Sequence, residues 1–158
     1  MVEDYALQLA EDVVLWSVGE VTTAELVRCA CDALIEGLDS QALRELAGAS
    51  ETDSQYEIED LLERVATELD FAFYARDSAD GRLAAARVLA ARCAAGHLPP
   101  RELARWMHER IKHGHPDRRV EALVSADDQY DILGYTNQSE ADIDRAVRAG
   151  AESLLAPE

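Results

Sequence analysis

The sequence predicts an all-α protein of about eight helices, and three observations support this fold class. Apolar residues recur at helical spacing over most of the 158 residues, and no segment has the alternating pattern of a half-buried strand. Residues typical of helix starts and helix ends flank these segments. Hydrophobic residues make up 48% of the chain and aromatic residues only 6%, and small side chains such as alanine allow helices to approach closely.

The first part of the chain predicts two helices. The first covers residues 4–17, and Gly19 follows its end. Thr22 and Glu25 then form a capping box, in which each side chain accepts a hydrogen bond from the backbone N–H of the other residue. The second helix ends at Gly37, because glycine readily adopts the left-handed conformation that closes a helix. The apolar residues expected to be buried are Ala6, Leu9, Val13, Trp16, Leu26, Ala30, Ala33 and Leu34.

Two further helices are predicted in the first half. A short one is capped by Asp39 or Ser40 and ends at Gly48. A longer one starts at a second capping box, formed by Ser54 and Glu57. Its apolar stripe is the clearest in the chain, and acidic residues cover the opposite face. The buried positions expected in these helices are Leu43, Leu46, Ile58, Leu61, Leu62, Val65 and Leu69.

The second half predicts four helices. The first of them covers residues 79–95 and is rich in alanine. Pro99 and Pro100 open the next helix, where proline loses no intrahelical hydrogen bond. Asp117 and Ser139 are the expected N-caps of the last two helices. The residues expected to be buried are Leu103, Trp106, Met107, Ile111, Val120, Leu123, Val124, Ile143, Val147 and Leu154.

One stretch of the sequence occurs twice. The residue numbers of Gly19 and Gly96 differ by 77, and those of Gly37 and Gly114 differ by the same offset. The residues after each glycine also correspond, as in G-E-V-T-T-A-E-L-V-R against G-H-L-P-P-R-E-L-A-R. We interpret this correspondence as a duplication of one helical unit.

The duplication predicts how the chain is organised. A shorter echo, Q-Y-E-I at residues 55–58 against Q-Y-D-I at residues 129–132, has the reduced offset of 74. We expect one all-helical domain over the 158 residues, with pseudo-repeat halves at 1–76 and 77–158. The expected apolar stripes are accounted for by one core, so a monomer or a weak oligomer is predicted.

The chain is strongly acidic, and its charge is uneven. The formal net charge is −17. Residues 1–81 hold 20 acidic and 4 basic side chains, residues 82–119 hold 3 and 9, and residues 120–158 hold 9 and 2. Nucleic-acid phosphates and anionic membranes repel such a protein, so neither is an expected partner. A basic protein is the expected partner, although acidic helix faces also serve solubility.

Cysteine usage and the N-terminal residues predict a cytoplasmic location. Cys29, Cys31 and Cys93 are odd in number and form no C-x-x-C motif, which is typical of buried thiols in a reducing compartment. The N-terminal M-V-E-D-Y lacks the basic and apolar parts of a signal peptide. No apolar run approaches the roughly 18 residues of a membrane span.

We expect a non-enzymatic protein that binds a basic protein partner through acidic helix faces. A neutraliser of the immunity or antitoxin type fits this description, because such proteins are small, helical and often acidic. A helical scaffold is a further alternative. The residues expected to contact the partner are Asp53, Glu57, Glu59, Asp60, Glu63, Asp127, Asp128 and Asp131.

Two acidic patterns offer an enzymatic alternative. Residues 127–131 match D-D-x-x-D, with which helical prenyltransferases hold magnesium on a diphosphate, but the second acidic motif and the aromatic pocket of those enzymes are missing. Glu57-x-x-Asp60 approaches the E-x-x-E pair of helical nucleotide pyrophosphohydrolases. We expect no cofactor, and Mg²⁺ only if this phosphohydrolase or diphosphate-binding alternative holds.

The histidines raise the question of a zinc site. On one helix, His108 and His113 would point about 140° apart, so zinc would need His113 and His115 together with a distant ligand such as Cys93 or His97. A histidine at a helix C-terminus also interacts favourably with the helix dipole. The sequence therefore predicts no metal. The candidates, if one is present, are His113, His115, Asp127, Asp128 and Asp131.

Three runs carry a resemblance to a group of bacterial proteins. They are G-L-D-S at residues 37–40, L-R-E-L-A-G at residues 43–48 and L-V-x-x-D-D-x-Y-D at residues 123–131. These runs resemble stretches of small all-helical proteins of GC-rich Gram-positive bacteria. The single lysine against 14 arginines agrees with GC-rich codon usage. The resemblance implies a helical fold and no particular activity.

Overall fold

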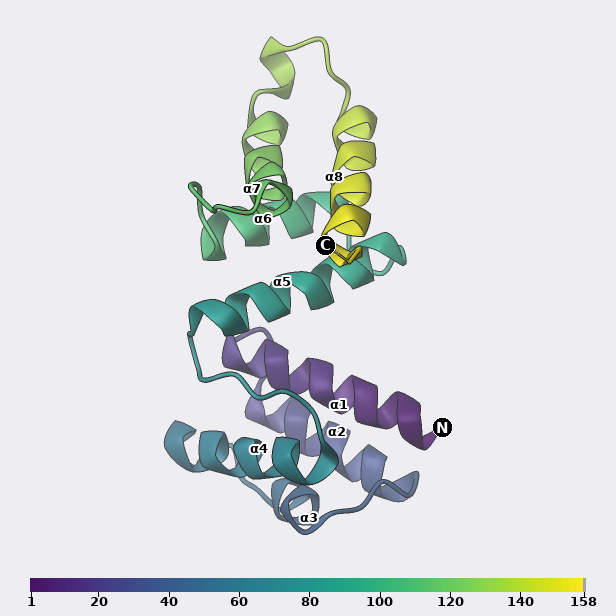
Figure 1. Cartoon of the computed structure of the whole chain (residues 1–158), viewed down its shortest axis with the longest axis vertical. Helices are drawn as coiled ribbons and strands as arrows, with labels where there is room; N and C mark the ends of the chain where they lie inside the picture. The colour runs from purple at the N-terminus through teal and green to yellow at the C-terminus, as the bar shows by residue number, and fades with distance from the viewer. Residues whose placement is uncertain (158) are drawn as a thin grey trace. The chain divides into compact units, whose positions relative to one another are not determined.

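The computed structural model describes residues 1–157, and over this range it contains eight α-helices, one short 3₁₀-helix and no strand (Figure 1). The predicted all-α fold class is therefore confirmed. The chain divides into two compact units, which we call unit 1 (Met1–Ala85) and unit 2 (from Ala86 onward). The boundary lies within α5 (Ala79–Ala94), whereas the predicted halves divide at residue 76.

Unit 1 is built from α1 to α4, which surround one apolar core. α2 packs against α1 and α3, α3 packs against α4, and α4 also contacts α1. The predicted inner faces of these helices are confirmed, because their large apolar side chains form the core of this unit. The helices are α1 (Val2–Ser17), α2 (Thr23–Ile35), α3 (Gln41–Ala47) and α4 (Gln55–Leu69).

The predicted helix ends of unit 1 are also confirmed. Thr22 and Ser54 cap α2 and α4, and Glu25 and Glu57 complete the two capping boxes. Such reciprocal hydrogen bonds satisfy backbone N–H groups that have no partner within the helix. Gly37 has a φ of +100° after α2, a conformation that side-chain-bearing residues rarely adopt.

The segment after α4 is fastened to the same unit by Arg76. Its backbone N–H donates to Glu59 Oε1 at 2.9 Å, and its guanidinium lies 4.7 Å from the centroid of a Trp16 ring. A cation above an aromatic face is attracted by the negative charge of the ring. The backbone N–H of Asp77 donates to the carbonyl oxygen of Ser17 at 3.0 Å. These contacts hold residues 70–78, which form no helix, against unit 1.

Unit 2 contains the C-terminal part of α5, three further α-helices that pack on one another and one short 3₁₀-helix. α6 contacts both α7 and α8, and α7 contacts α8 (Figure 1). At one point α7 and α8 approach so closely that a Cβ added to Gly150 would meet Leu123 Cδ2 at 2.9 Å. The elements are α6 (Pro100–Arg110), α7 (Arg118–Asp131), the 3₁₀-helix η1 (Leu133–Tyr135) and α8 (Glu140–Leu155).

The D-D-Q-Y-D run occupies the last turns of α7. Tyr130 connects this part of α7 to α8, because its ring is buried and its hydroxyl donates to Asp144 Oδ1 in α8 at 2.6 Å. The guanidinium of Arg101 lies 5.3 Å from the centroid of the same ring. The helical geometry places Asp127 and Asp128 one turn before the end of α7.

The sequence repeat has a counterpart in the helix bounds. When the chain is compared with itself at the offset of the repeated glycines, α5 corresponds to α1 in both its first and its last residue. At the same offset, the starts of α6 and α7 correspond to the starts of α2 and α3. In contrast, residues 55–58 begin α4 whereas residues 129–132 end α7, so the shorter echo does not mark equivalent positions. The internal duplication itself stays a prediction.

No helix in residues 1–157 is both long enough and apolar enough to cross a membrane. The expectation that the chain has no membrane-spanning segment therefore holds for the described residues.

Replacing Leu62 tests the packing of unit 1. This side chain is 0% exposed, so Leu62→Ala leaves a cavity and should lower the free energy of unfolding by about 2–5 kcal/mol. Leu7 is 61% exposed on α1, and Leu7→Ala should change the same free energy by less than about 0.5 kcal/mol. Urea unfolding followed by far-UV circular dichroism measures both. Equal losses would contradict the described core.

Candidate functional site

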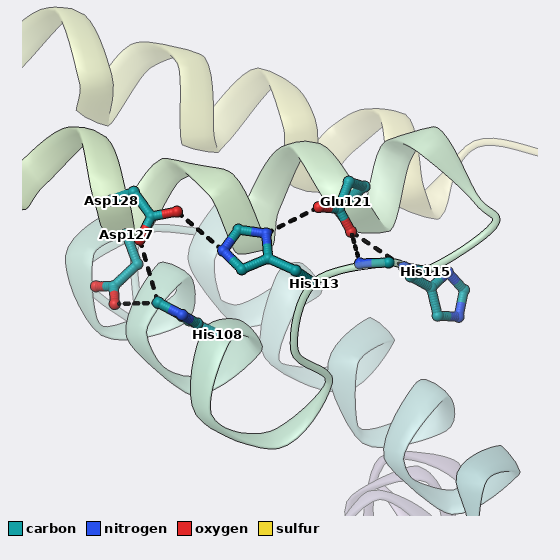
Figure 2. A network of polar contacts seen from close by, with 7 residues as sticks. His108, His113, His115, Glu121, Asp127 and Asp128 are labelled. Atoms are coloured by element: carbon teal, nitrogen blue, oxygen red, sulfur yellow. Dashed lines mark hydrogen bonds and ion pairs between the residues drawn. The ribbon is translucent and has the colours of Figure 1, made fainter.

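Five polar side chains of unit 2 converge beside the connection between α6 and α7. His108 lies on α6, His113 lies in the connection, and the other three lie on α7 (Figure 2). The two imidazole rings are arranged edge to face, with their centroids 4.9 Å apart. We call this group the His–carboxylate cluster. Its members are His108, His113, Glu121, Asp127 and Asp128.

The end of α6 brings the two histidines together. The helix stops at Arg110, and Lys112 adopts a left-handed conformation with a φ of +69°. The backbone N–H groups of Ile111 and Lys112 both donate to the carbonyl oxygen of Met107, which closes the helix. The chain then reverses, so His113 returns toward α7. The expectation that the two rings point away from each other is wrong, because it assumed one helix through both residues.

Glu121 fixes the path of the connection between α6 and α7. Its Oε2 accepts hydrogen bonds from the backbone N–H groups of Gly114 and His115, at 2.9 and 3.1 Å. Its Oε1 lies 2.9 Å from His113 Nδ1. One side chain in the first turn of α7 therefore anchors the loop that precedes the helix. Glu121 was not among the residues predicted from the sequence, and its only signal there is its position shortly after the Asp117 N-cap.

Both ring nitrogens of His113 face carboxylates. Nδ1 lies 2.9 Å from Glu121 Oε1, and Nε2 lies 2.9 Å from Asp128 Oδ2. An ionised carboxylate only accepts hydrogen bonds, so each nitrogen must carry a proton, or a cation must lie between the nitrogen and the oxygen. The hydrogen bond that His113 donates to Glu121 and the negative charge of Asp128 raise the pKa of His113 above its ordinary 6.5. The same hydrogen bond from His113 lowers the pKa of Glu121 below its ordinary 4.5.

His108 completes the cluster from the other helix. Its Nδ1 lies 2.9 Å from Asp127 Oδ2 and 3.7 Å from Asp128 Oδ1. The side chain of Asp127 is only 16% exposed, so this carboxylate is shielded from water, and its interaction with the ring is stronger than it would be at the surface. Two imidazoles therefore share a small space with three carboxylates.

The cluster opens to solvent through a pocket of about 570 Å³. The pocket is wider than one ion needs, so water or a small ligand can enter beside the two rings. Lys112, the single lysine of the chain, is one of its lining residues. The lining residues are His108, Glu109, Lys112, His113 and Asp127.

The structure separates the metal candidates that were predicted from the sequence. His113, Asp127 and Asp128 belong to the cluster, whereas Asp131 is exposed at the end of α7. The Nδ1 of His115 accepts a hydrogen bond from the backbone N–H of Asp117 at 3.1 Å, so this ring serves the start of α7. The cluster contains His108 in its place.

Five acidic residues on α4 or just before it are predicted to contact a partner. Three of these five have local structural roles. The carboxylate of Asp53 accepts from the backbone N–H of Ser50, Glu57 completes a capping box, and Glu59 holds the backbone of Arg76. Asp60 and Glu63 are exposed on the outer face of α4. The acidic residues of this face belong to unit 1, and Asp127, Asp128 and Asp131 belong to unit 2.

The buried cysteines are poor nucleophiles. Burial raises the pKa of Cys29 to about 12 and also raises the pKa of Cys93. A thiol attacks as the thiolate, so neither residue is activated at neutral pH.

Replacing Glu121 tests the charge state of His113. Glu121→Gln should lower the pKa of His113, because the ring loses the carboxylate on its Nδ1. The contribution of His113 to stability is complete below its unfolded pKa near 6.5 and is lost as the pH rises through the raised folded value. The contribution of Glu121 is complete above about 4.5 and is lost as the pH falls through its lowered folded value.

An NMR titration of the histidine ring protons, in a chelator-treated sample, measures this pKa. Glu102→Gln removes the same charge at the other end of α6 and should leave the pKa of His113 unchanged. A titration of His113 that is the same in both variants would show that Glu121 does not hold the ring.

Comparison of the chain with family models, with curated proteins and with solved structures found no match.

Proposed function

We propose that this chain is a non-enzymatic protein that binds a basic protein partner through the exposed face of α4. The observation that carries the proposal is the exposed Tyr56, which stands on this face in line with Asp60 and Glu63. A neutraliser of the immunity or antitoxin type, with a basic toxin as its partner, is the specific form of this proposal.

Helical geometry places these three residues together. Asp60 and Glu63 follow Tyr56 by four and seven residues, so their side chains lie within about 60° of one another around the helix axis. The apolar stripe of Ile58, Leu62 and Val65 points to the opposite side, into the core. The exposed face therefore takes no part in the packing of unit 1.

The exposed aromatic ring gives this face a property that solubility does not require. Tyr56 is 81% exposed at the start of α4. Tyrosine is enriched among the residues that dominate the energy of protein interfaces, since its ring buries a large area and its hydroxyl can still form a hydrogen bond. A partner that covers Tyr56 would also meet the carboxylates of Asp60 and Glu63.

The charge of unit 1 favours a basic partner. Unit 1 contains 20 acidic and 5 basic side chains, a net charge of −15. Such a field accelerates the association of an oppositely charged protein, and the acceleration weakens as salt screens the charges. Complementary charges close to the interface also slow dissociation.

The first experiment is capture of the partner from a lysate of the source organism at low and at high salt, followed by mass spectrometry. The affinity of the captured protein for variants of this chain then tests whether the α4 face is the binding surface. Asp60→Lys with Glu63→Lys, and separately Tyr56→Ala, should each weaken binding by about tenfold or more. Glu59 is left unchanged, because its loss would release Arg76.

The matched control is Asp32→Lys with Glu36→Lys. These two residues lie on or next to α2, and the exchange changes the net charge by the same amount. This control should slow association but leave the dissociation rate unchanged. If both double variants weaken binding equally, net charge alone explains the effect. If the affinity is unchanged in all variants, the α4 face is not the binding surface. A large thermal shift with magnesium and nucleotide would favour the enzymatic alternative instead.

A further inference from the structure

We propose that His108, His113 and Asp128 form a binding site for one divalent transition-metal ion of the zinc class. The site lies in unit 2 and is independent of the partner-binding face proposed for α4.

The donor atoms already lie close together. One nitrogen of each histidine and one carboxylate oxygen of Asp128 lie within 4.8 Å of one another. Ligand atoms about 2.0–2.2 Å from a tetrahedral zinc ion are roughly 3.4 Å apart. The donors therefore need to approach one another by no more than about 1.4 Å (4.8 minus 3.4) to bind one ion.

The charges of the cluster favour a cation at this position. Nε2 of His113 lies 2.9 Å from Asp128 Oδ2 while Nδ1 already faces Glu121. Either a second proton on the imidazole or a metal ion between Nε2 and the carboxylate satisfies this arrangement. The largely shielded Asp127 adds a further negative charge beside the ion.

Glu121 provides the supporting interaction that metal-binding histidines commonly have. A ligating histidine usually donates its other ring N–H to a carboxylate, which fixes the tautomer and the orientation of the ring. Glu121 Oε1 lies in that position on Nδ1 of His113, which leaves Nε2 for the metal. Two backbone N–H groups hold the other oxygen of Glu121, so the carboxylate is itself fixed.

The donor set selects the class of metal. Imidazole nitrogens suit zinc, iron, nickel and copper, whereas magnesium and calcium prefer all-oxygen sites. Three protein donors leave a coordination position open to water. The pocket of about 570 Å³ beside the two rings allows an ion to enter and a water molecule to fill that position.

The cluster has no counterpart in unit 1. The positions of unit 1 that correspond to the cluster, at the offset of the repeated glycines, contain no histidine, although the helices there begin at corresponding residues. The cluster is therefore particular to unit 2. The residues at those positions are Cys31, Glu36, Arg44, Ser50 and Glu51.

Isothermal titration calorimetry of the untagged full chain with ZnCl₂, at about pH 7.5, tests the site. We expect about one zinc ion per chain and no comparable binding of MgCl₂. His113→Ala and His108→Ala should abolish zinc binding. Asp128→Asn keeps the shape of the side chain and should weaken binding at least about tenfold, and Glu121→Gln should weaken it about 10- to 100-fold.

His97 provides the matched control. His97→Ala should bind zinc as the unchanged chain does, because this ring does not belong to the cluster. NMR adds a direct readout, since zinc should shift the ring protons of His108 and His113 and leave those of His97 and His115 in place. Far-UV circular dichroism establishes that each variant is folded.

Three results would overturn the proposal. They are the absence of zinc binding by the unchanged chain, zinc binding that persists in both the His108→Ala and His113→Ala variants, and an equal loss in the His97→Ala control. Persistent binding would direct attention to the cysteines instead.

Discussion

The hydrogen bonds of Glu121 are the constraint on which the geometry of the His–carboxylate cluster depends. Without them, the backbone N–H groups of Gly114 and His115, in the short connection after α6, would lose their acceptor. With them, His113 stands between α6 and α7, close to the ring of His108. The same carboxylate orients the ring through Nδ1. One side chain thus determines both the loop and the direction of its histidine.

Local sequence patterns were sufficient to predict most of the fold. Capping boxes such as that of Ser54 and Glu57 form between residues three apart, so they are visible in the sequence, and the structure contains them at the predicted positions. Apolar stripes predicted the inner faces of α1 to α4 for the same reason. The division of charge follows the division into units, with −15 on unit 1 and −2 on unit 2. The boundary within α5 was not predicted, because a continuous helical pattern contains no signal of it.

The cluster was only partly predictable, because its contacts join residues far apart in the sequence. Asp128 and His113 lie on separate elements, and Asp127 follows His108 by 19 in the numbering. Their meeting depends on the left-handed Lys112, and glycine, not lysine, is the residue usually found in that conformation. The carboxylates of residues 127 and 128 were recognised as candidates from the D-D-x-x-D run. His108 and Glu121 became recognisable only through the course of the chain after α6.

The position of Lys112 has a practical consequence for handling the protein. It is the only lysine among 158 residues, and it lines the pocket beside the two clustered histidines. Apart from the N-terminal amine, amine-reactive dyes, cross-linkers and sensor surfaces will therefore attach at this pocket and at no other side chain. Immobilisation through Lys112 obstructs the pocket of unit 2 and leaves the side chains of unit 1 unmodified. A fluorophore placed on Lys112 would conversely report on events at the pocket.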